Sequence, residues 1–434
     1  MNRLIIIGNG FDLAHGLKTS YSHFINDYWK KTIQKLQNEV NKNVTTYLYT
    51  FETEDIKIEN VPGNHYNAGN WVIADTYEDL IKILKAQNLE LIFKNEFLKI
   101  ITNKFKEQNW VDIEIEYYSL LKDTFKKQDC IYGIEKLNED FKRIKVALES
   151  YLAEEEKFFI QNSDKYLNYR RLKYNIGYKI YAPFKLKDFT EVAINRRAQE
   201  EYKKYIIDTN GLKSDTITNE ELNKESKNLI SKLGIEASER EIRKILINDG
   251  AHNYFDLTPN EILFLNFNYT FTEKIYANHS EFDSFIPGKR ISKQYIHIHG
   301  TTDKFDNNNV IFGFGDEIDD DYKSIENLNN NIYLENIKSI KYLETDNYKK
   351  LLEFLNSEEY QIYIFGHSCG ISDRTLLNTL FEHKNCSSIK PFYYKKDDGF
   401  DNYSDIVKNI SRNFNIKPIM RDKVVNKEYC EPLS

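Results

Sequence analysis

The chain opens with the stretch Arg3-Leu4-Ile5-Ile6-Ile7-Gly8-Asn9-Gly10-Phe11-Asp12-Leu13-Ala14-His15-Gly16-Leu17, which decides the fold. Its continuous apolar run is typical of a strand buried on both faces. The Gly-x-Gly behind the run allows a tight turn and a close approach of the backbone to a ligand. Thr19 or Ser20 can then cap a helix whose first N–H groups would favour a diphosphate. Strand, glycine turn and helix form the first half of a parallel α/β unit.

This turn differs from the fingerprint of nicotinamide dehydrogenases. Leu13 stands where the third glycine of G-x-G-x-x-G belongs, and Asp27 falls inside the expected helix instead of ending a second strand. A dehydrogenase is therefore disfavoured. The alternative, that Gly8, Gly10 and Gly16 only serve turns of a buried core, stays open at this point.

Composition bounds the class of protein. The 434 residues carry a net charge of −7, which gives no sign of the basic surface of a dedicated nucleic-acid binder. The four cysteines form no C-x-x-C pair, so we expect reduced thiols and no structural zinc. No apolar run is long enough for a signal sequence or a membrane span, and we expect a cytoplasmic protein.

Strand patterns separated by helices predict one mostly parallel, doubly wound, Rossmann-like α/β sheet with helices on both faces. The first strand belongs to it despite a large, mainly helical insertion at 41–255, so the nucleotide-binding core is expected from 1–40 and 256–434. The further strands are predicted at 262–267, 295–300, 310–315, 361–365 and 389–394, and the core helices at 347–355, 372–383 and 405–414.

The insertion shows helical periodicity at 79–106, after Trp110, and in a long helix from Ile134 to Leu152. The acidic run Asp112, Glu114 and Glu116 either forms a site or only favours the dipole at a helix start, and we prefer the second interpretation.

Polar residues stand at the carboxyl ends of four of the predicted strands. They are Gly8-Asn9-Gly10, Asn268, His299-Gly300 and Gly366-His367-Ser368. In an open parallel sheet, ligands bind at the carboxyl ends of the strands, so these segments are expected to meet in one site. Each also has a harmless explanation as a helix cap, a turn or a strand end.

Two competing interpretations concern the same residues. Gly366-His367-Ser368-Cys369-Gly370 spells the G-x-S-x-G of a serine hydrolase, but only His383 follows Ser368, which leaves the triad incomplete in its usual order. His297 and His299 share a strand face and could bind a metal, but spacing assigns no third ligand, and no metal is expected.

Five motifs together resemble the AbiH family of bacterial phage abortive-infection proteins. The resemblance spans nearly the whole chain and implies a role in antiphage defence. The motifs are Gly8 to Tyr21, Trp110-Val111-Asp112-Ile113-Glu114, Asn268-Tyr269-Thr270, Ile296-His297-Ile298-His299-Gly300 and Gly366-His367-Ser368 through Ser372-Asp373.

The order of these motifs is also similar to the sirtuin-like domains of bacterial defence NADases. This resemblance implies that Asn268 and His299 are the catalytic pair. It implies that the residues around NAD are Gly8, Asn9, Gly10, Phe11, Asp12, Gly300, Gly366, Ser368 and Asp373. The sequence departs from these relatives at Phe267-Asn268-Tyr269-Thr270, where they read Thr-Asn-Tyr-Asp, and at Phe11-Asp12, where a serine is common.

The expected activity is therefore NAD glycohydrolase, with NAD as substrate. Asn268 would orient ribose and water, His299 would take a proton, and Asp12 would contact a ribose hydroxyl or cap the helix. The alternative is a non-catalytic or nucleic-acid-directed effector that senses a nucleotide or a phage component, with Lys203, Lys204 and Arg240 available for contact. A phage-derived trigger and a second copy of the chain are the other partners considered, and a membrane is not expected.

Overall fold

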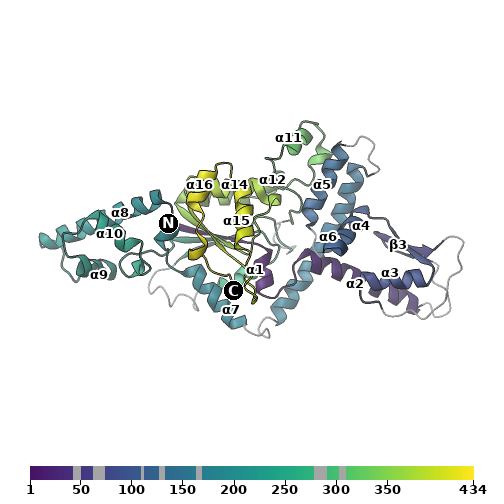
Figure 1. Ribbon diagram of the computed structural model, residues 1–434, viewed down its shortest axis with the longest axis horizontal. Helices are drawn as coiled ribbons and strands as arrows, with labels where there is room; N and C mark the ends of the chain where they lie inside the picture. Colours follow the sequence, from purple (N-terminus) through teal and green to yellow (C-terminus); the bar gives the residue numbers. More distant parts are fainter. Residues whose placement is uncertain are drawn as a thin grey trace. The chain divides into compact units, whose positions relative to one another are not determined.

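A computed structural model describes residues 1–42, 50–61, 74–108, 112–126, 132–162, 169–277, 291–302 and 309–434. The chain forms two compact units (Figure 1). Unit 1 comprises Met1–His15, Asn162–Gly300 and Tyr342–Ser434, and unit 2 comprises Gly16–Gln161 and Thr301–Lys341. No helix among the described residues is both long and apolar enough to span a membrane.

Unit 1 contains a five-stranded parallel sheet in the order β6-β5-β1-β7-β8. The strands are β1 (Asn2–Ile7), β5 (Glu261–Asn266), β6 (Ser292–His297), β7 (Tyr360–Phe365) and β8 (Cys386–Phe392). Counted along the chain this order is 3-2-1-4-5, so the direction of winding reverses between β1 and β7. The mixed α/β class and the central place of the first strand are confirmed.

Helices cover both faces of this sheet, because residues alternate between faces along each strand. Ile5, Ile7 and Phe365 pack with Ile176 and Ile180 of α7 (Tyr169–Tyr181). On the opposite face Tyr360 contacts Phe354 of α13 (Asn347–Ser357), and its hydroxyl donates to the Leu380 carbonyl of α14 (Arg374–Glu382) at 2.9 Å. The short α1 (Asn9–Ala14) follows β1 directly, and α15 (Tyr403–Arg412) and α16 (Lys417–Lys423) contact β8.

A second core of unit 1 lies among α8 (Glu191–Lys213), α9 (Lys224–Leu233) and α10 (Glu239–Leu246). Each of these helices begins at a side-chain cap, provided by Thr190, Asn223 and Ser238. The caps explain why the sequence stops and restarts its helical pattern here.

Unit 2 combines helices with a small antiparallel sheet, β2-β3-β4. Its elements are α2 (Tyr21–Lys42), β2 (Thr50–Glu52), β3 (Ile56–Asn60), α3 (Tyr77–Ala86), β4 (Leu89–Phe93), α4 (Glu96–Gln108), α5 (Ile113–Lys126), α6 (Ile134–Asn162), α11 (Asp320–Glu326) and α12 (Lys338–Lys341). The predicted cap is present, because the Ser20 hydroxyl accepts from the His23 N–H at 3.3 Å. Trp110 lies outside the described residues.

Three sequence expectations about the elements are wrong. A helix does not run through 79–106, since Asn88 takes a positive φ of 56° and β4 pairs with β3. The segment 310–315 does not join the large sheet, because the Gly313 N–H donates to a Glu114 carboxylate and Phe314 makes only an isolated bridge to Ile337. The helix capped at Ser20 is not the first helix after the glycine turn, since α1 comes before it.

The compact units do not follow the boundaries at 40 and 255 expected for the two domains. Helices α7 to α10, placed by the sequence in the insertion, belong to the same unit as the large sheet. Arg3 of β1 explains part of this, because its buried guanidinium donates to the Ile180 and Ala182 carbonyls at 2.7 and 2.8 Å. The chain therefore returns to the sheet well before residue 256.

Candidate functional site

Two turns that are far apart in sequence interlock at the carboxyl ends of β1 and β7. A Cβ on Gly10 would lie 2.8 Å from the Gly366 carbonyl oxygen, and one on Gly366, whose φ is +69°, would lie 2.1 Å from the Phe11 nitrogen. A Cβ on Gly8 would lie 2.5 Å from the His367 Cα. These glycines are therefore required by the close approach of two backbones, and not by a tight turn alone.

The same contacts use the backbone donors of the first turn. The N–H groups of Gly8, Gly10 and Phe11 donate to Phe365, Gly366 and Gly8 carbonyls at 3.0, 2.8 and 2.8 Å. The Phe11 side chain lies in the sheet core. A diphosphate near this turn would need other donors than these three groups. Asn9 is the exposed member of the turn.

The loop after β5 is held by a buried polar network. Asn266 accepts from the Asn268 N–H at 2.8 Å, and its own Nδ2 donates to the Thr270 carbonyl and to Glu273 at 2.9 and 2.7 Å. Glu273 also faces His297 Nε2 at 3.0 Å. The network fixes the backbone that presents Asn268. His297 is thus a partner of a buried carboxylate, and among the described residues no group of three His, Cys, Asp or Glu side chains is placed so that it could hold a metal ion.

Asp12 joins the first turn to this loop. The Thr270 hydroxyl donates to Asp12 Oδ2 at 2.6 Å, whereas Asp12 Oδ1 and Asn268 Nδ2 have no partner within hydrogen-bond distance among the described residues. Burial raises the pKa of Asp12 to about 7, and Glu273 adds to the rise, while the nearby Thr270, Thr272 and Asn268 side chains oppose it. The site therefore contains a carboxyl group that titrates near neutral pH.

The His299 ring contacts Phe267 and Tyr269, the two residues that flank Asn268. Its Nδ1 donates to the Phe267 carbonyl at 3.1 Å, so in the neutral ring the lone pair is on Nε2, 3.1 Å from the Tyr342 hydroxyl. Asp373 Oδ1 lies 3.3 Å from the same Nε2. A proton taken up at Nε2 would therefore face a carboxylate, an arrangement that suits a general base.

Asp373 also faces a second histidine. His367 Nδ1 accepts from the Cys369 N–H at 3.0 Å, so its Nε2 carries the proton and lies 3.5 Å from Asp373 Oδ2. The Phe267 ring contacts both imidazoles, at 5.1 Å from His299 and 4.4 Å from His367. We call Asp12, Asn268, His299, His367 and Asp373 the strand-end cluster. Its side chains come from the ends of β1, β5, β6 and β7.

The remaining predicted site residues, Gly300 and Ser368, lie in turns at the ends of β6 and β7. Gly300 takes a φ of +77° in the turn after β6, and the Ser368 side chain is exposed. His367, within the G-x-S-x-G turn, and His299 both face Asp373, and His383 Nδ1 accepts from the Asn385 N–H at the end of α14. These contacts disfavour the serine hydrolase interpretation.

Sequence reasoning placed His367 among the residues expected to meet at this edge but assigned no role to its side chain. It assigned no role to Tyr342 or Thr270 either. Thr270 could have been found, since it stands where the sirtuin-like relatives have an aspartate. Tyr342 carried no signal, because it lies outside any strand end.

His15, which lies in the first motif, has a structural role. Its Nδ1 donates to the Phe11 carbonyl and its Nε2 accepts from the Tyr276 hydroxyl, both at 2.7 Å. Burial lowers the pKa of His15 to about 4, so the ring is neutral.

The acidic run of unit 2 is structural, as preferred from the sequence. Asp112 caps α5 by accepting from the Glu114 and Ile115 N–H groups at 3.1 Å, and Glu116 pairs with Lys104. Glu114 is buried, and it accepts from the Gly313 N–H at 3.2 Å and from Lys338 Nζ at 2.8 Å.

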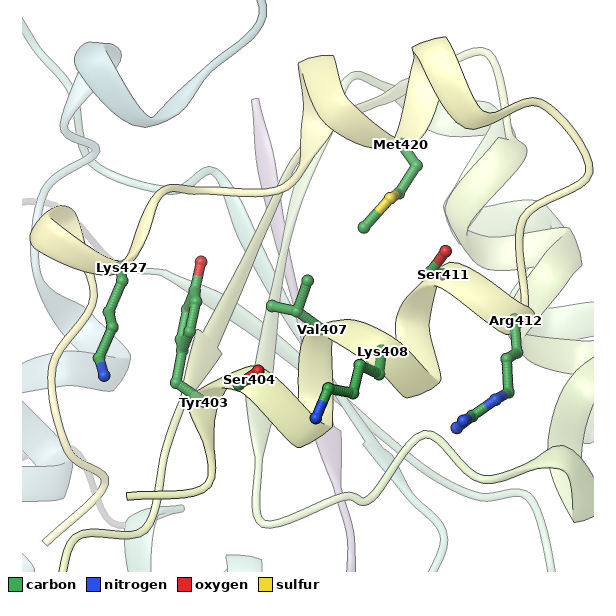
Figure 2. A pocket seen from close by; sticks show the side chains of 8 residues that line it. All are labelled: Tyr403, Ser404, Val407, Lys408, Ser411, Arg412, Met420 and Lys427. Atoms are coloured by element: carbon green, nitrogen blue, oxygen red, sulfur yellow. The ribbon is translucent and has the colours of Figure 1, made fainter. Parts of the chain in front are cut away.

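Unit 1 also has an open pocket away from the predicted residues (Figure 2). Helix α15 contributes most of its lining, and α16 and the segment after it complete it. The lining residues are Tyr403, Ser404, Val407, Lys408, Ser411, Arg412, Met420 and Lys427.

Comparisons with known proteins identify a family. Neither the curated proteins nor the solved structures contain a significant match to this chain. The family model described as bacteriophage abortive infection AbiH matches residues 4–395, almost the full length. The chain therefore belongs to the AbiH family, whose membership indicates a role in bacteriophage abortive-infection defence.

Proposed function

We propose that the protein hydrolyses the bond between nicotinamide and ribose of NAD as its defence activity. The observation that carries the proposal is the strand-end cluster, in which the segments that carry Asn268 and His299 meet. Phe267 and Tyr269, which flank Asn268, both contact the His299 ring. The 3-2-1-4-5 strand order and the reversal between β1 and β7 further support a sirtuin-like, Rossmann-type site at that edge.

The reaction can be assigned to these residues in balanced form. His299 Nε2 takes a proton from water, the water oxygen bonds to the ribose carbon, and the bond from that carbon to nicotinamide breaks with its electron pair leaving on nicotinamide. Asp373 stabilises the imidazolium, and Tyr342 shares Nε2 until the water arrives. The products are nicotinamide, ADP-ribose and a proton.

Asn268 would bind the sugar through its side-chain oxygen. Only the NH₂ end of an amide can donate, so the nearby Asp12 carboxylate favours Nδ2 on its own side. Oδ1 is then directed away from Asp12 and can accept from a ribose hydroxyl or from the attacking water. In this assignment Asp12 positions Asn268.

The test is nicotinamide release from NAD by the purified protein, with and without phage lysate. Asn268→Ala and His299→Ala should each lower turnover by roughly 10²-fold or more. His383→Ala is the matched control, because His383 lies outside the cluster, and it should retain activity. Undiminished turnover in both cluster variants would rule the assignment out.

A second candidate function is favoured by the glycine turn. In this second function the protein senses a nucleotide and does not cleave it. The N–H groups of Gly8, Gly10 and Phe11 are engaged within the chain, so this turn does not provide them to fix the diphosphate of NAD in a pose for cleavage. Calorimetry separates the two functions. A sensor binds NAD but leaves it intact in the presence of phage lysate. Infected cells then keep their NAD, whether they contain the wild-type protein or the His299→Ala variant.

A further inference from the structure

The pocket on α15 has the charge and chemistry of an anion site. Lys408, Arg412 and Lys427 line it, and none of its lining residues is acidic. The Ser404 and Ser411 hydroxyls add neutral donors. Asp405 and Asp401, which pair with Lys408 and Lys427, lie outside the lining, so the excess positive charge of this surface is that of Arg412. It occurs in a chain whose net charge is −7, so it is a feature of this surface and not of the composition.

The three basic side chains of the pocket differ in whether a carboxylate pairs with them. Lys408 pairs with Asp405 at 2.9 Å, but both side chains are more than 60% exposed, so the pair contributes little and can be exchanged. Lys427 pairs with Asp401 at 2.7 Å. Arg412 donates to the neutral Asn409 amide, and no carboxylate pairs with it among the described residues. Arg412 therefore keeps its full charge for a ligand.

The rest of the lining suits an apolar, planar group. Figure 2 shows Met420 extending from α16 toward α15, where Val407 lies, and the Tyr403 ring standing between Val407 and Lys427. The Tyr403 hydroxyl donates to the Val425 carbonyl at 2.7 Å, which holds this ring in place. The pocket is open to solvent, and its volume of about 620 Å³ admits a group of nucleotide size.

The pocket is linked to the strand-end cluster by one side chain. Asn409 accepts from Arg412 through Oδ1 and donates through Nδ2 to the Ser368 carbonyl at 2.8 Å. One turn later, Asn413 Nδ2 donates to the Cys369 carbonyl at 2.8 Å. These two carbonyls belong to the turn that carries His367 and leads to Asp373. A ligand that draws Arg412 away from Asn409 would thus loosen a bond to that turn.

We propose that this pocket is a regulatory site for a phosphate monoester of nucleotide size. The phosphate binds Lys408 and Arg412, which are one helical turn apart, and the base lies against Val407, Met420 and the Tyr403 ring. Binding releases Asn409 and changes the turn at 366–370. The binding step is independent of the proposed function, and only the resulting change in nicotinamide release rests on it.

Hydrogen exchange of the intact protein tests the proposal, with AMP as the probe and adenosine and inorganic phosphate as its two halves. We expect AMP to slow exchange at 403–412 and 420–427 and to speed it at 366–370. Adenosine and phosphate alone should do so only at roughly tenfold higher concentration. AMP bound at the strand-end cluster would instead slow exchange near Asp12 and Asn268.

Three variants sharpen the test. Arg412→Gln should weaken the AMP footprint on α15 about tenfold, while Arg421→Gln, an exposed arginine of α16 outside the lining, should leave it unchanged. Asn409→Ala should keep the footprint but show fast exchange at 366–370 before AMP is added. The proposal is overturned if saturating AMP leaves 403–412 unprotected, if both arginine variants behave alike, or if 366–370 does not respond in the wild type. The wild-type footprint needs no variant, so a misfolded variant does not remove the test.

Discussion

The two units each bury a cluster of ionisable groups, and the clusters differ in how completely they are satisfied. In unit 2, Glu114 accepts from Lys338 and Gly313, and the neighbouring Tyr117 and Asn336 are hydrogen-bonded around Asn138. In unit 1, the strand-end cluster leaves Asp12 Oδ1 and Asn268 Nδ2 without a partner within hydrogen-bond distance among the described residues.

The difference supports the proposal that the strand-end cluster, and not the cluster around Glu114, is the functional site. A buried ion pair whose hydrogen bonds are all formed has a structural role. Buried polar atoms without a hydrogen-bond partner cost folding free energy, and a ligand or a water molecule can provide the missing partner. Both clusters include motif residues of the chain, so a motif alone does not separate the two roles. The following changes test the contrast, starting with the largest expected effect.

Gly366→Ala should remove the strand-end cluster altogether. The new Cβ would lie 2.1 Å from the Phe11 nitrogen, so the two turns must separate, at a cost of more than about 4 kcal/mol. Gly399→Ala is the matched control. Gly399 also has a positive φ, +88°, but no atom lies within 4 Å of its added Cβ, and we expect a loss of about 1 kcal/mol. Thermal unfolding compares them, and equal losses would contradict the interlocked turns.

Lys338→Met should destabilise unit 2 by about 3–5 kcal/mol, because Glu114 would remain buried without its cation. The double variant Glu114→Gln with Lys338→Met removes both charges and should recover most of that loss. Native-state hydrogen exchange of α5 measures both. If the double variant is no better than the single one, the pair is not a self-contained structural unit.

Asp12→Asn should change how stability depends on pH. The pKa of Asp12 is about 7 in the folded chain against an ordinary 3.8, so folding binds a proton between these values. The contribution of this proton to the free energy of unfolding is complete below pH 4 and is lost as the pH rises to about 7. The loss is roughly 1.4 kcal/mol per pH unit, or about 4 kcal/mol in all. The variant stays neutral, so it should match wild type at pH 4 and exceed it at pH 8. Urea unfolding of both proteins across this pH range measures how the free energy of unfolding depends on pH. If the two curves are parallel, Asp12 is in contact with water and the prediction is wrong.

The fold could be predicted where local patterns agree with burial. The apolar runs of β1, β5 and β7 are buried strands because their residues face helices on both sides of the sheet. The segment 310–315 has the same apolar pattern, but its backbone donor is taken by Glu114, a residue about 200 positions away. Local sequence periodicity contains no information about so distant a partner, so the prediction of a strand at 310–315 is wrong.

For the candidate site, the sequence predicted the meeting of segments better than the role of each residue. The segments that carry Asn268, His299 and Asp373 meet because parallel strands end at one edge of a sheet. The sequence did not predict that the N–H groups of Gly8, Gly10 and Phe11 form hydrogen bonds within the chain, because these bonds depend on the close approach of Gly366. Whether NAD binds at this edge stays a prediction.

The central position of β1 also has a consequence for synthesis on the ribosome. Among the strands of this sheet, β1 is synthesised before β5 and β7, which flank it, and the earlier of these two neighbours begins at Glu261. At roughly 5–20 residues per second, this apolar strand waits on the order of 10–50 s for a partner. The nascent chain must keep Leu4 to Ile7 covered during that interval, and the strand-end cluster cannot exist until translation has passed Asp373.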